Sequence, residues 1–114
     1  MRYLALVFSN EVQPSLTELE PRRLGDAYNR FNLDARAAGV LLDGGRVQSP
    51  DMATVVRARD RGTEVEDAPC ADTDGPVCGF YMLECENLDQ AIEWAARIPH
   101  ASIGAVEIRP ILDR

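Results

Sequence analysis

The sequence predicts an α+β fold in which two helices cover one face of a β-sheet. Its 114 residues are enough for one domain, residues 1–114, that buries about two-thirds of its unfolded surface. Apolar residues recur at strand or helix spacing in the order strand, helix, strand, hairpin, strand, helix, strand. Two helices are too few to cover both faces of such a sheet. We therefore predict a ferredoxin-like sandwich with an extra β-hairpin and with both helices on one face.

The first three elements are a strand, a helix and a second strand. Both faces of the strand at 2–8 are apolar, as in a strand that is covered on both sides. The sequence at 17–20 is typical of a capping box, and the helix that it opens should end at Gly39. A second strand at 40–47 should be weakened or bulged at the glycine pair 44–45.

The middle of the chain predicts a hairpin and a further strand. Strands at 53–58 and 63–67 are joined by a turn at 59–62, and another strand follows at 79–85. We expect the strands at 63–67 and 79–85 to lie in one sheet, joined by an acidic loop that contains prolines. Small binding sites are often built on such loops.

The last two elements are a helix and a strand. Asn87 is a helix cap, and the helix should run to Ile98, where Pro99 ends it. The strand at 104–109 alternates apolar and polar residues and ends at Pro110.

The face of the sheet that the helices leave open should be covered by a second copy of the chain. The strands at 2–8 and 79–85 carry apolar side chains on both faces. A sheet of this kind left in water would expose a large apolar patch, which is uncommon in monomers. We therefore predict a sheet-to-sheet homodimer.

The charge pattern argues against nucleic acid as a partner. The net charge is −7, and the segment 62–96 holds nine acidic residues and no basic one. Phosphate contacts supply much of nucleic-acid affinity, so an acidic chain without a basic stripe is a poor nucleic-acid binder. No apolar run is long enough to span a membrane, and the start of the chain continues as a strand pattern. The chain has no lysine, which excludes lysine Schiff-base chemistry.

The three cysteines are predicted to be free thiols. Cys70, Cys78 and Cys85 match no zinc or redox spacing, and their odd number fits no disulfide framework. Free thiols and the lack of an export signal favour a cytoplasmic protein. One histidine and scattered carboxylates show no metal-ligand spacing, so we predict neither a metal nor a cofactor.

With these elements in place, the chain resembles the YCII-related family, in particular its DGPF branch, over nearly its whole length. The resemblance rests on an ordered set of pieces, which are the opening strand and the segments 37–41, 65–67, 79–81, 88–99 and 106–110. The family implies a ferredoxin-like domain paired as a dimeric α/β barrel, in agreement with the fold and the homodimer predicted above.

Two departures limit what the resemblance implies. The Asp-Gly-Pro-Phe tetrapeptide of the DGPF branch appears here as Asp67-Ala-Pro-Cys70, so a small thiol replaces an aromatic side chain. Some relatives carry a histidine on the first helix, paired with an acidic residue as a catalytic dyad, and Tyr28 stands at that position here. The dyad chemistry therefore cannot be carried over. For most members of the DGPF branch the family implies no established reaction.

Asp67, Pro69 and His100 are the first candidate site residues. Asp67 could bind a ligand donor or act as a base at the mouth of the loop that Pro69 shapes. An aspartate before a proline turn more often bonds its own backbone. His100 is the only histidine and the only side chain that is expected to titrate near neutral pH, although a lone loop histidine is more often just exposed.

Tyr28, Asp43, Cys70 and Glu107 are the candidate ligand-binding residues. Glu107 shares a strand face with Arg109 and either faces a ligand space or forms an ion pair with an arginine. Tyr28 and Asp43 could line a cavity between the first helix and the sheet, or be a core tyrosine and a turn residue. Acidic neighbours disfavour the thiolate of Cys70, so we expect an inert thiol there.

Two functions of different classes fit these residues. The first is a small dimeric binding or accessory protein, regulatory by resemblance, with a pocket for a small organic molecule between helices and sheet. The alternative is a cofactor-independent enzyme of the lyase or isomerase type that acts on a small cyclic or phenolic metabolite. Its proton transfer would be shared by His100, Asp67 and Tyr28, and it requires His100 and Asp67 at one cavity. A purely structural dimer is the third interpretation.

Overall fold

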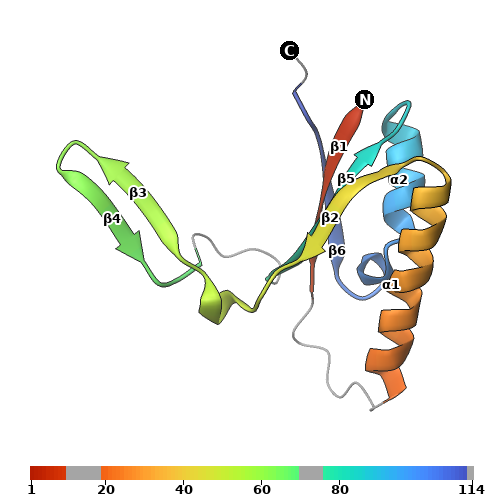
Figure 1. Ribbon diagram of the computed structural model, residues 1–114, viewed down its shortest axis with the longest axis horizontal. Coiled ribbons are helices and arrows are strands. Elements are labelled where there is room, and N and C mark those ends of the chain that lie inside the picture. The colour runs from red at the N-terminus through yellow and green to blue at the C-terminus, as the bar shows by residue number, and fades with distance from the viewer. Residues whose placement is uncertain (10–18, 70–75, 113–114) are drawn as a thin grey trace.

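The computed structural model describes residues 1–9, 19–69 and 76–112 (Figure 1). The strands are β1 (Arg2–Phe8), β2 (Leu41–Arg46), β3 (Val55–Arg59), β4 (Gly62–Glu66), β5 (Val77–Glu84) and β6 (Ala105–Pro110). The helices are α1 (Leu19–Ala37) and α2 (Leu88–Ala96), and two short 3-10 turns are η1 (Pro50–Met52) and η2 (Pro99–Ala101). Among the described residues, no helix is long and apolar enough to cross a membrane.

The main sheet has four strands in the order β2-β5-β1-β6, and every neighbouring pair is antiparallel. Strands β1 and β2 are therefore parallel, with β5 between them, and α1 connects them. In the same way α2 connects β5 to β6, with β1 between them. These are two interleaved split β-α-β units. Both helices lie on the same side of the sheet (Figure 1), so the predicted α+β arrangement with helices on one face is confirmed.

The hydrophobic core lies between the sheet and the helices. Tyr3, Ala5 and Val7 of β1 are buried on this face. Ala5 has no exposed surface, and neither does Leu83 of the neighbouring strand β5. The helices meet them with Phe31, Ala35, Ala91 and Ala95, and Ile98 follows α2. The alternate residues of β1 turn to the other face, as the period of two in a strand requires.

We call the face of the main sheet turned away from the helices the open face. On it, Leu4 and Leu6 of β1 pair with Met82 and Phe80 of β5. All four side chains remain partly exposed. No helix of the described chain lies on this side (Figure 1). The part of the open face formed by β1 and β5 is thus apolar and lacks cover within the described part of one chain.

The predicted end of α1 at Gly39 and the predicted cap of α2 at Asn87 are both confirmed. Gly39 has φ 72°, a left-handed conformation that suits glycine after the end of α1. At α2, the side chain of Asn87 accepts a hydrogen bond from the Gln90 backbone N–H at 2.9 Å. This helix ends at Ala96, two residues before the predicted end, because Pro99 opens η2 and Ile98 becomes its cap. The capping box predicted at 17–20 begins outside the described residues.

The predicted bulge in the second strand lies elsewhere. The register of β2 shifts between Leu41 and Asp43, whereas Gly44 and Gly45 pair regularly with Tyr81 and Phe80. Gly44 is required for a different reason. A Cβ atom there would lie 2.5 Å from the Tyr81 ring and 2.9 Å from the Phe80 carbonyl oxygen. The glycine therefore lets β2 approach β5 closely.

The prediction that the strands at 63–67 and 79–85 share a sheet is wrong. Strand β4 pairs with β3 in a separate two-stranded sheet. The reason is that both edges of β5 are taken, one by β1 and the other by β2. The hairpin of β3 and β4, residues 55–66, projects from the main sheet on the side opposite the helices (Figure 1), and we call it the arm. The radius of gyration is 16.1 Å, against about 13 Å for a compact domain of this length.

Candidate functional site

A cavity of about 470 Å³ opens between α1 and the edge of the sheet formed by β2 and β5. We call it the Tyr–His cavity, after the two titratable side chains that meet in its wall. Its lining includes Tyr28 and Asn32 from α1, Arg46 from β2, Cys78 and Tyr81 from β5, and His100 from η2. The sheet edge is open here because Gly44, Gly45 and Gly79 add no side chains to the lining.

Tyr28 and His100 are joined by a hydrogen bond. The Tyr28 hydroxyl oxygen lies 2.5 Å from Nδ1 of His100, and the ring centroids are 5.6 Å apart. His100 reaches this position because Pro99 ends α2 and starts η2, which folds the chain back toward α1. The backbone N–H of Gly104 donates to the His100 carbonyl at 2.7 Å and fixes the turn. Two segments 72 residues apart in the chain thus meet in one wall of the cavity.

Both members of the pair are neutral at pH 7. Burial raises the pKa of Tyr28 well above its usual range, with a further contribution from Cys78. Burial also lowers the pKa of His100, and the positive charge of Arg46 lowers it further. One ring nitrogen of a neutral imidazole is a donor and the other an acceptor. The hydrogen bond therefore runs either from the Tyr28 hydroxyl to Nδ1 or from Nδ1–H to the Tyr28 oxygen.

The charge of the cavity is positive. Arg36 and Arg46 belong to its lining, and no aspartate or glutamate is among the described lining residues. Burial raises the pKa of the Cys78 thiol, so Cys78 is not a thiolate nucleophile at neutral pH. The Tyr81 hydroxyl donates to Oδ1 of Asn32 at 2.9 Å, which holds that amide in place. The arrangement can accept an anionic or strongly polar group beside a neutral acid–base pair.

Of the sequence-predicted residues, the structure brings Tyr28 and His100 together. Asp67 and Pro69 are exposed, follow the arm, and do not belong to the lining of the Tyr–His cavity. Cys70 lies outside the described residues. The condition that His100 and Asp67 share one cavity is not met within one chain, because β4 ends in the arm and not beside β5.

Asp43 and Glu107 have local partners. The Asp43 carboxylate accepts from the backbone N–H of Gly44 at 2.8 Å, the turn-type role that the sequence left open. Glu107 pairs with Leu6 on the open face, away from the helices. It accepts a hydrogen bond from Arg109 at 2.7 Å, so the ion pair forms within one strand.

Arg46, Cys78 and Asn32 are cavity residues that pattern reasoning did not single out. Arg46 ends β2 directly after the glycine pair, and this is the one local signal that could have pointed to it. Cys78 sits at an irregularity in the pairing of β5 with β1, where the register shifts between Val7 and Phe8. Such a shift cannot be predicted before the partner strand is known.

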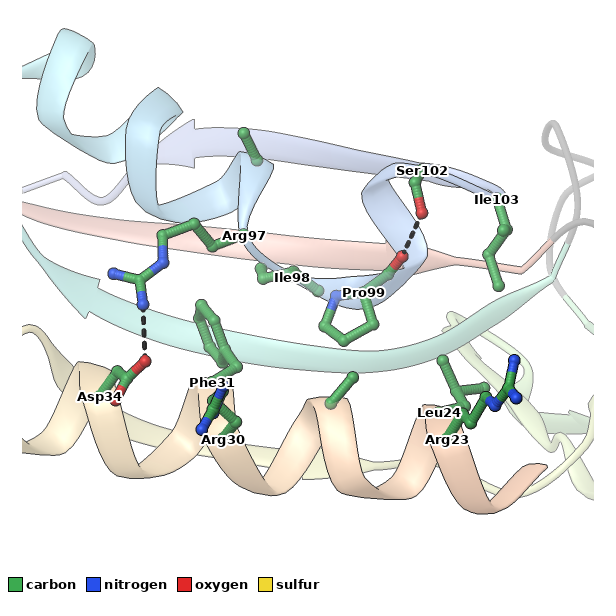
Figure 2. A pocket seen from close by; sticks show the side chains of 12 residues that line it. Arg23, Leu24, Arg30, Phe31, Asp34, Arg97, Ile98, Pro99, Ser102 and Ile103 are labelled. Atoms are coloured by element: carbon green, nitrogen blue, oxygen red, sulfur yellow. Dashed lines mark hydrogen bonds and ion pairs between the residues drawn. The ribbon is translucent and has the colours of Figure 1, made fainter. Parts of the chain in front are cut away.

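A second hollow, about 690 Å³, lies between α1 and the segment 96–103, which runs from the end of α2 through η2 (Figure 2). Phe31 and Ile98 lie at its base, and Nη2 of Arg97 contacts Oδ2 of Asp34 across it at 2.7 Å. The Arg97 guanidinium also stacks 4.3 Å from the Trp94 ring centroid. The Ser102 hydroxyl donates to the Pro99 carbonyl at 3.0 Å and has no base beside it. This hollow offers no acid–base pair, so the Tyr–His cavity is the better candidate site.

Metal chemistry finds no support in the described side chains. Across residues 1–9, 19–69 and 76–112, no three histidine, cysteine, aspartate or glutamate side chains gather as metal ligands would.

The chain is similar in sequence to one protein family and in fold to a solved enzyme structure. A model of the YCII-related domain matches residues 1–114. An uncharacterised protein of Rhizobium meliloti (strain 1021) is 29% identical over 114 residues, which cover 97% of this chain and 92% of the relative. The fold is similar to that of 5-chloro-2-hydroxyhydroquinone dehydrochlorinase from Burkholderia phenoliruptrix, solved in complex with 2,5-dihydroxybenzoquinone. That match has a TM-score of 0.55 and 14% identity, and it covers 98% of this chain and 94% of the other.

Proposed function

Because the chain belongs to the YCII-related domain family, we propose that it binds a small organic molecule in the Tyr–His cavity. The observation that supports this most is the neutral Tyr28–His100 pair in the wall of a preformed cavity. A volume of about 470 Å³ lies within the range of small-molecule sites. Such sites combine apolar walls with a few placed polar groups, as Tyr28, His100 and Asn32 are placed here.

The ligand carries an anionic or strongly polar oxygen group. Arg36 and Arg46 line the cavity, and the described lining holds no carboxylate to neutralise them. Arg46 lies close enough to His100 to lower the pKa of the imidazole, so the positive charge of Arg46 acts on groups inside the cavity. The similar fold of the dehydrochlorinase was solved with a small cyclic molecule, which is compatible with a ligand of this size.

Binding can be tested by thermal shift and calorimetry with small carboxylates, phenols and cyclic ketones. A ligand at 100 times its Kd should stabilise the fold by about 2.7 kcal/mol. We expect an anionic ligand to raise the melting midpoint of the wild type, and Arg46→Gln to abolish that rise. Arg59→Gln, at the tip of the arm, removes the same charge away from the cavity and should bind like the wild type. The proposal fails if no compound binds, or if both variants lose binding equally.

The scheme in which Asp67 shares proton transfer is not supported, because Asp67 does not line the cavity of His100. The hydrogen bond of His100 favours a reduced form of the second function, proton transfer without a cofactor by His100 and Tyr28 alone. When Nδ1–H of His100 donates to the Tyr28 oxygen, the lone pair of Nε2 is free to act as a base. The Nε2 atom would take a proton from carbon beside a carbonyl, leaving the electron pair in an enolate. The Tyr28 O–H would donate to the enolate oxygen. Exchange of the Nε2 proton with solvent, followed by transfer to the same carbon, completes hydrogen exchange, and transfer to the conjugated carbon completes isomerisation.

Deuterium uptake by small cyclic ketones, followed by NMR, tests this second function. We expect the wild type to exchange the proton faster than buffer and His100→Gln to lose about 100-fold or more of that rate. Arg59→Gln should exchange like the wild type. A wild-type rate no faster than buffer would remove the enzyme hypothesis while leaving the binding proposal intact.

We further propose that the protein works as a homodimer that covers its open faces, in the reducing cytoplasm. Leu4, Leu6, Phe80 and Met82 supply an apolar surface of the kind that monomers seldom leave in water. Cys78 and Cys85 are free thiols, which fits a reducing compartment.

A further inference from the structure

We propose that the arm, residues 55–66, is a clasp that packs its uncharged face against a second copy of this chain. This inference rests on the homodimer proposed above, and it assigns a role in that dimer to a surface that the Tyr–His cavity does not use. It rests on the two faces of the arm, on its isolation from the rest of the fold, and on its position beside the open face.

The arm is amphipathic. Val56 pairs with Val65, and Ala58 pairs with Thr63, so one face of the hairpin carries four uncharged side chains. The other face carries the charged residues Arg57, Arg59, Glu64 and Glu66, together with Val55. Alternation of this kind is typical of an antiparallel sheet with one covered and one solvated face. Yet Val56 and Val65 are 62% and 64% exposed.

Within the described chain, the arm has no strand partner outside itself. Strands β3 and β4 pair only with each other there and form a sheet of their own. Figure 1 shows the hairpin standing away from both the main sheet and the helices. An isolated two-stranded hairpin is marginally stable in water and needs a third strand or another packed surface. The arm therefore requires an external surface to become a well-ordered part of the protein.

A second copy is the occupant that fits the position of the arm. The arm projects on the same side of the sheet as the open face (Figure 1). A copy seated on the open face would lie beside the arm, so one association would cover both exposed apolar surfaces. In a two-fold symmetric dimer the same contact forms twice, because each copy offers an arm and an open face. Met52, in η1 directly before the arm, is a further exposed apolar side chain, at 69%.

The test compares three single substitutions. Val65→Asp places a charge on the uncharged face of the arm, and Glu64→Gln is the matched control on its charged face. Leu6→Asp places a charge on the open face. Sedimentation over a concentration series measures the dimer Kd, and hydrogen exchange measures protection of the amides of residues 55–66.

We expect the wild type to dimerise, with arm amides that gain protection as protein concentration rises. Val65→Asp should raise the dimer Kd at least tenfold and abolish that protection, while amides of β1 and β5 keep their protection and show that the main sheet stays folded. Glu64→Gln should match the wild type. Leu6→Asp should also weaken the dimer.

Three results would overturn the clasp. One is a Val65→Asp protein that dimerises like the wild type while Leu6→Asp does not, which would leave an open-face dimer without the arm. Another is protection of the arm that does not change with concentration. The third is a wild type that stays monomeric with an unprotected arm, which would assign the uncharged face to a partner other than a second copy. None of these results bears on ligand binding in the Tyr–His cavity, which calorimetry measures separately.

Discussion

The main sheet with its two helices and the arm are both built from antiparallel strands with alternating side chains, but their apolar faces meet different surroundings. In β1, the alternate residues Tyr3, Ala5 and Val7 are buried against helices of the same chain. In the arm, Val56 and Val65 alternate in the same way and remain exposed. The period of two is the same in both regions.

The two regions show what alternation can and cannot predict. A strand that alternates apolar and polar residues indicates that one face is meant to be covered. It does not indicate whether the cover comes from the same chain. For β1 the cover is supplied within the chain by Phe31 and Ala35 of α1, among others. For the arm the described chain supplies none, and the proposed cover is a second copy.

Truncation of one apolar side chain in each region should give the largest contrast. Leu83→Ala removes a side chain with no exposed surface from the centre of the core and should cost about 2–5 kcal/mol of unfolding free energy. Val65→Ala, at 64% exposure, should change the stability of the monomer by less than about 0.5 kcal/mol. Urea unfolding at low protein concentration measures both values. Equal costs would mean that the arm is already packed within one chain.

Local features of the fold could be predicted from the sequence, and pairings between distant strands could not. Gly39 and Asn87 mark helix ends because a positive φ and a side-chain cap are properties of a few neighbouring residues. The partner of β4 depends on which edges of β5 remain free, and that depends on β2 and β1. The bulge of β2 between Leu41 and Asp43 is likewise set by its register against β5.

In the candidate site, too, single residues could be predicted from the sequence and the contacts between distant residues could not. Tyr28 and His100 stood out singly, one on a helical stripe and the other as the only histidine. Their contact joins residues 72 apart and follows from how η2 folds back. The alternation at 104–109 predicts Glu107 and Arg109 on one strand face, and their pairing with Leu6 and Leu4 agrees. That this face is the open one follows from the pairing of Glu107 with Leu6, which no local pattern reveals.

The two regions should also differ in how they affect the pH dependence of folding stability. We expect this dependence to come from the Tyr–His cavity and not from the arm. Folding lowers the pKa of His100 below its unfolded value of 6.5, through burial first and Arg46 second. Between these two values the unfolded chain binds more protons, so stability falls as pH drops below about 6.5 and is fully present above it. Because His100 is the only histidine, His100→Gln should flatten the stability profile between pH 7 and 5.

Tyr28→Phe sharpens this second contrast. Loss of the hydrogen bond to His100 should cost about 1 kcal/mol at pH 7. Melting midpoints of the wild type and the two variants across this pH range provide the measurement. A wild-type profile as flat as that of His100→Gln would mean that the ring titrates as it does in water.

The smallest effect is expected on the charged face of the arm. Nη1 of Arg57 lies 2.8 Å from Oε2 of Glu66, and the two side chains are 34% and 56% exposed. Exposed ion pairs of this kind contribute about 0.2–1 kcal/mol and weaken in salt. A double-mutant cycle with Arg57→Gln and Glu66→Gln should therefore give a coupling in that range, lower in 1 M salt. A larger coupling that salt does not weaken would place the charged face in an interface. In that case the charged face of the arm would be the covered one and the face of Val56 and Val65 the solvated one, opposite to β1, whose apolar side chains are covered.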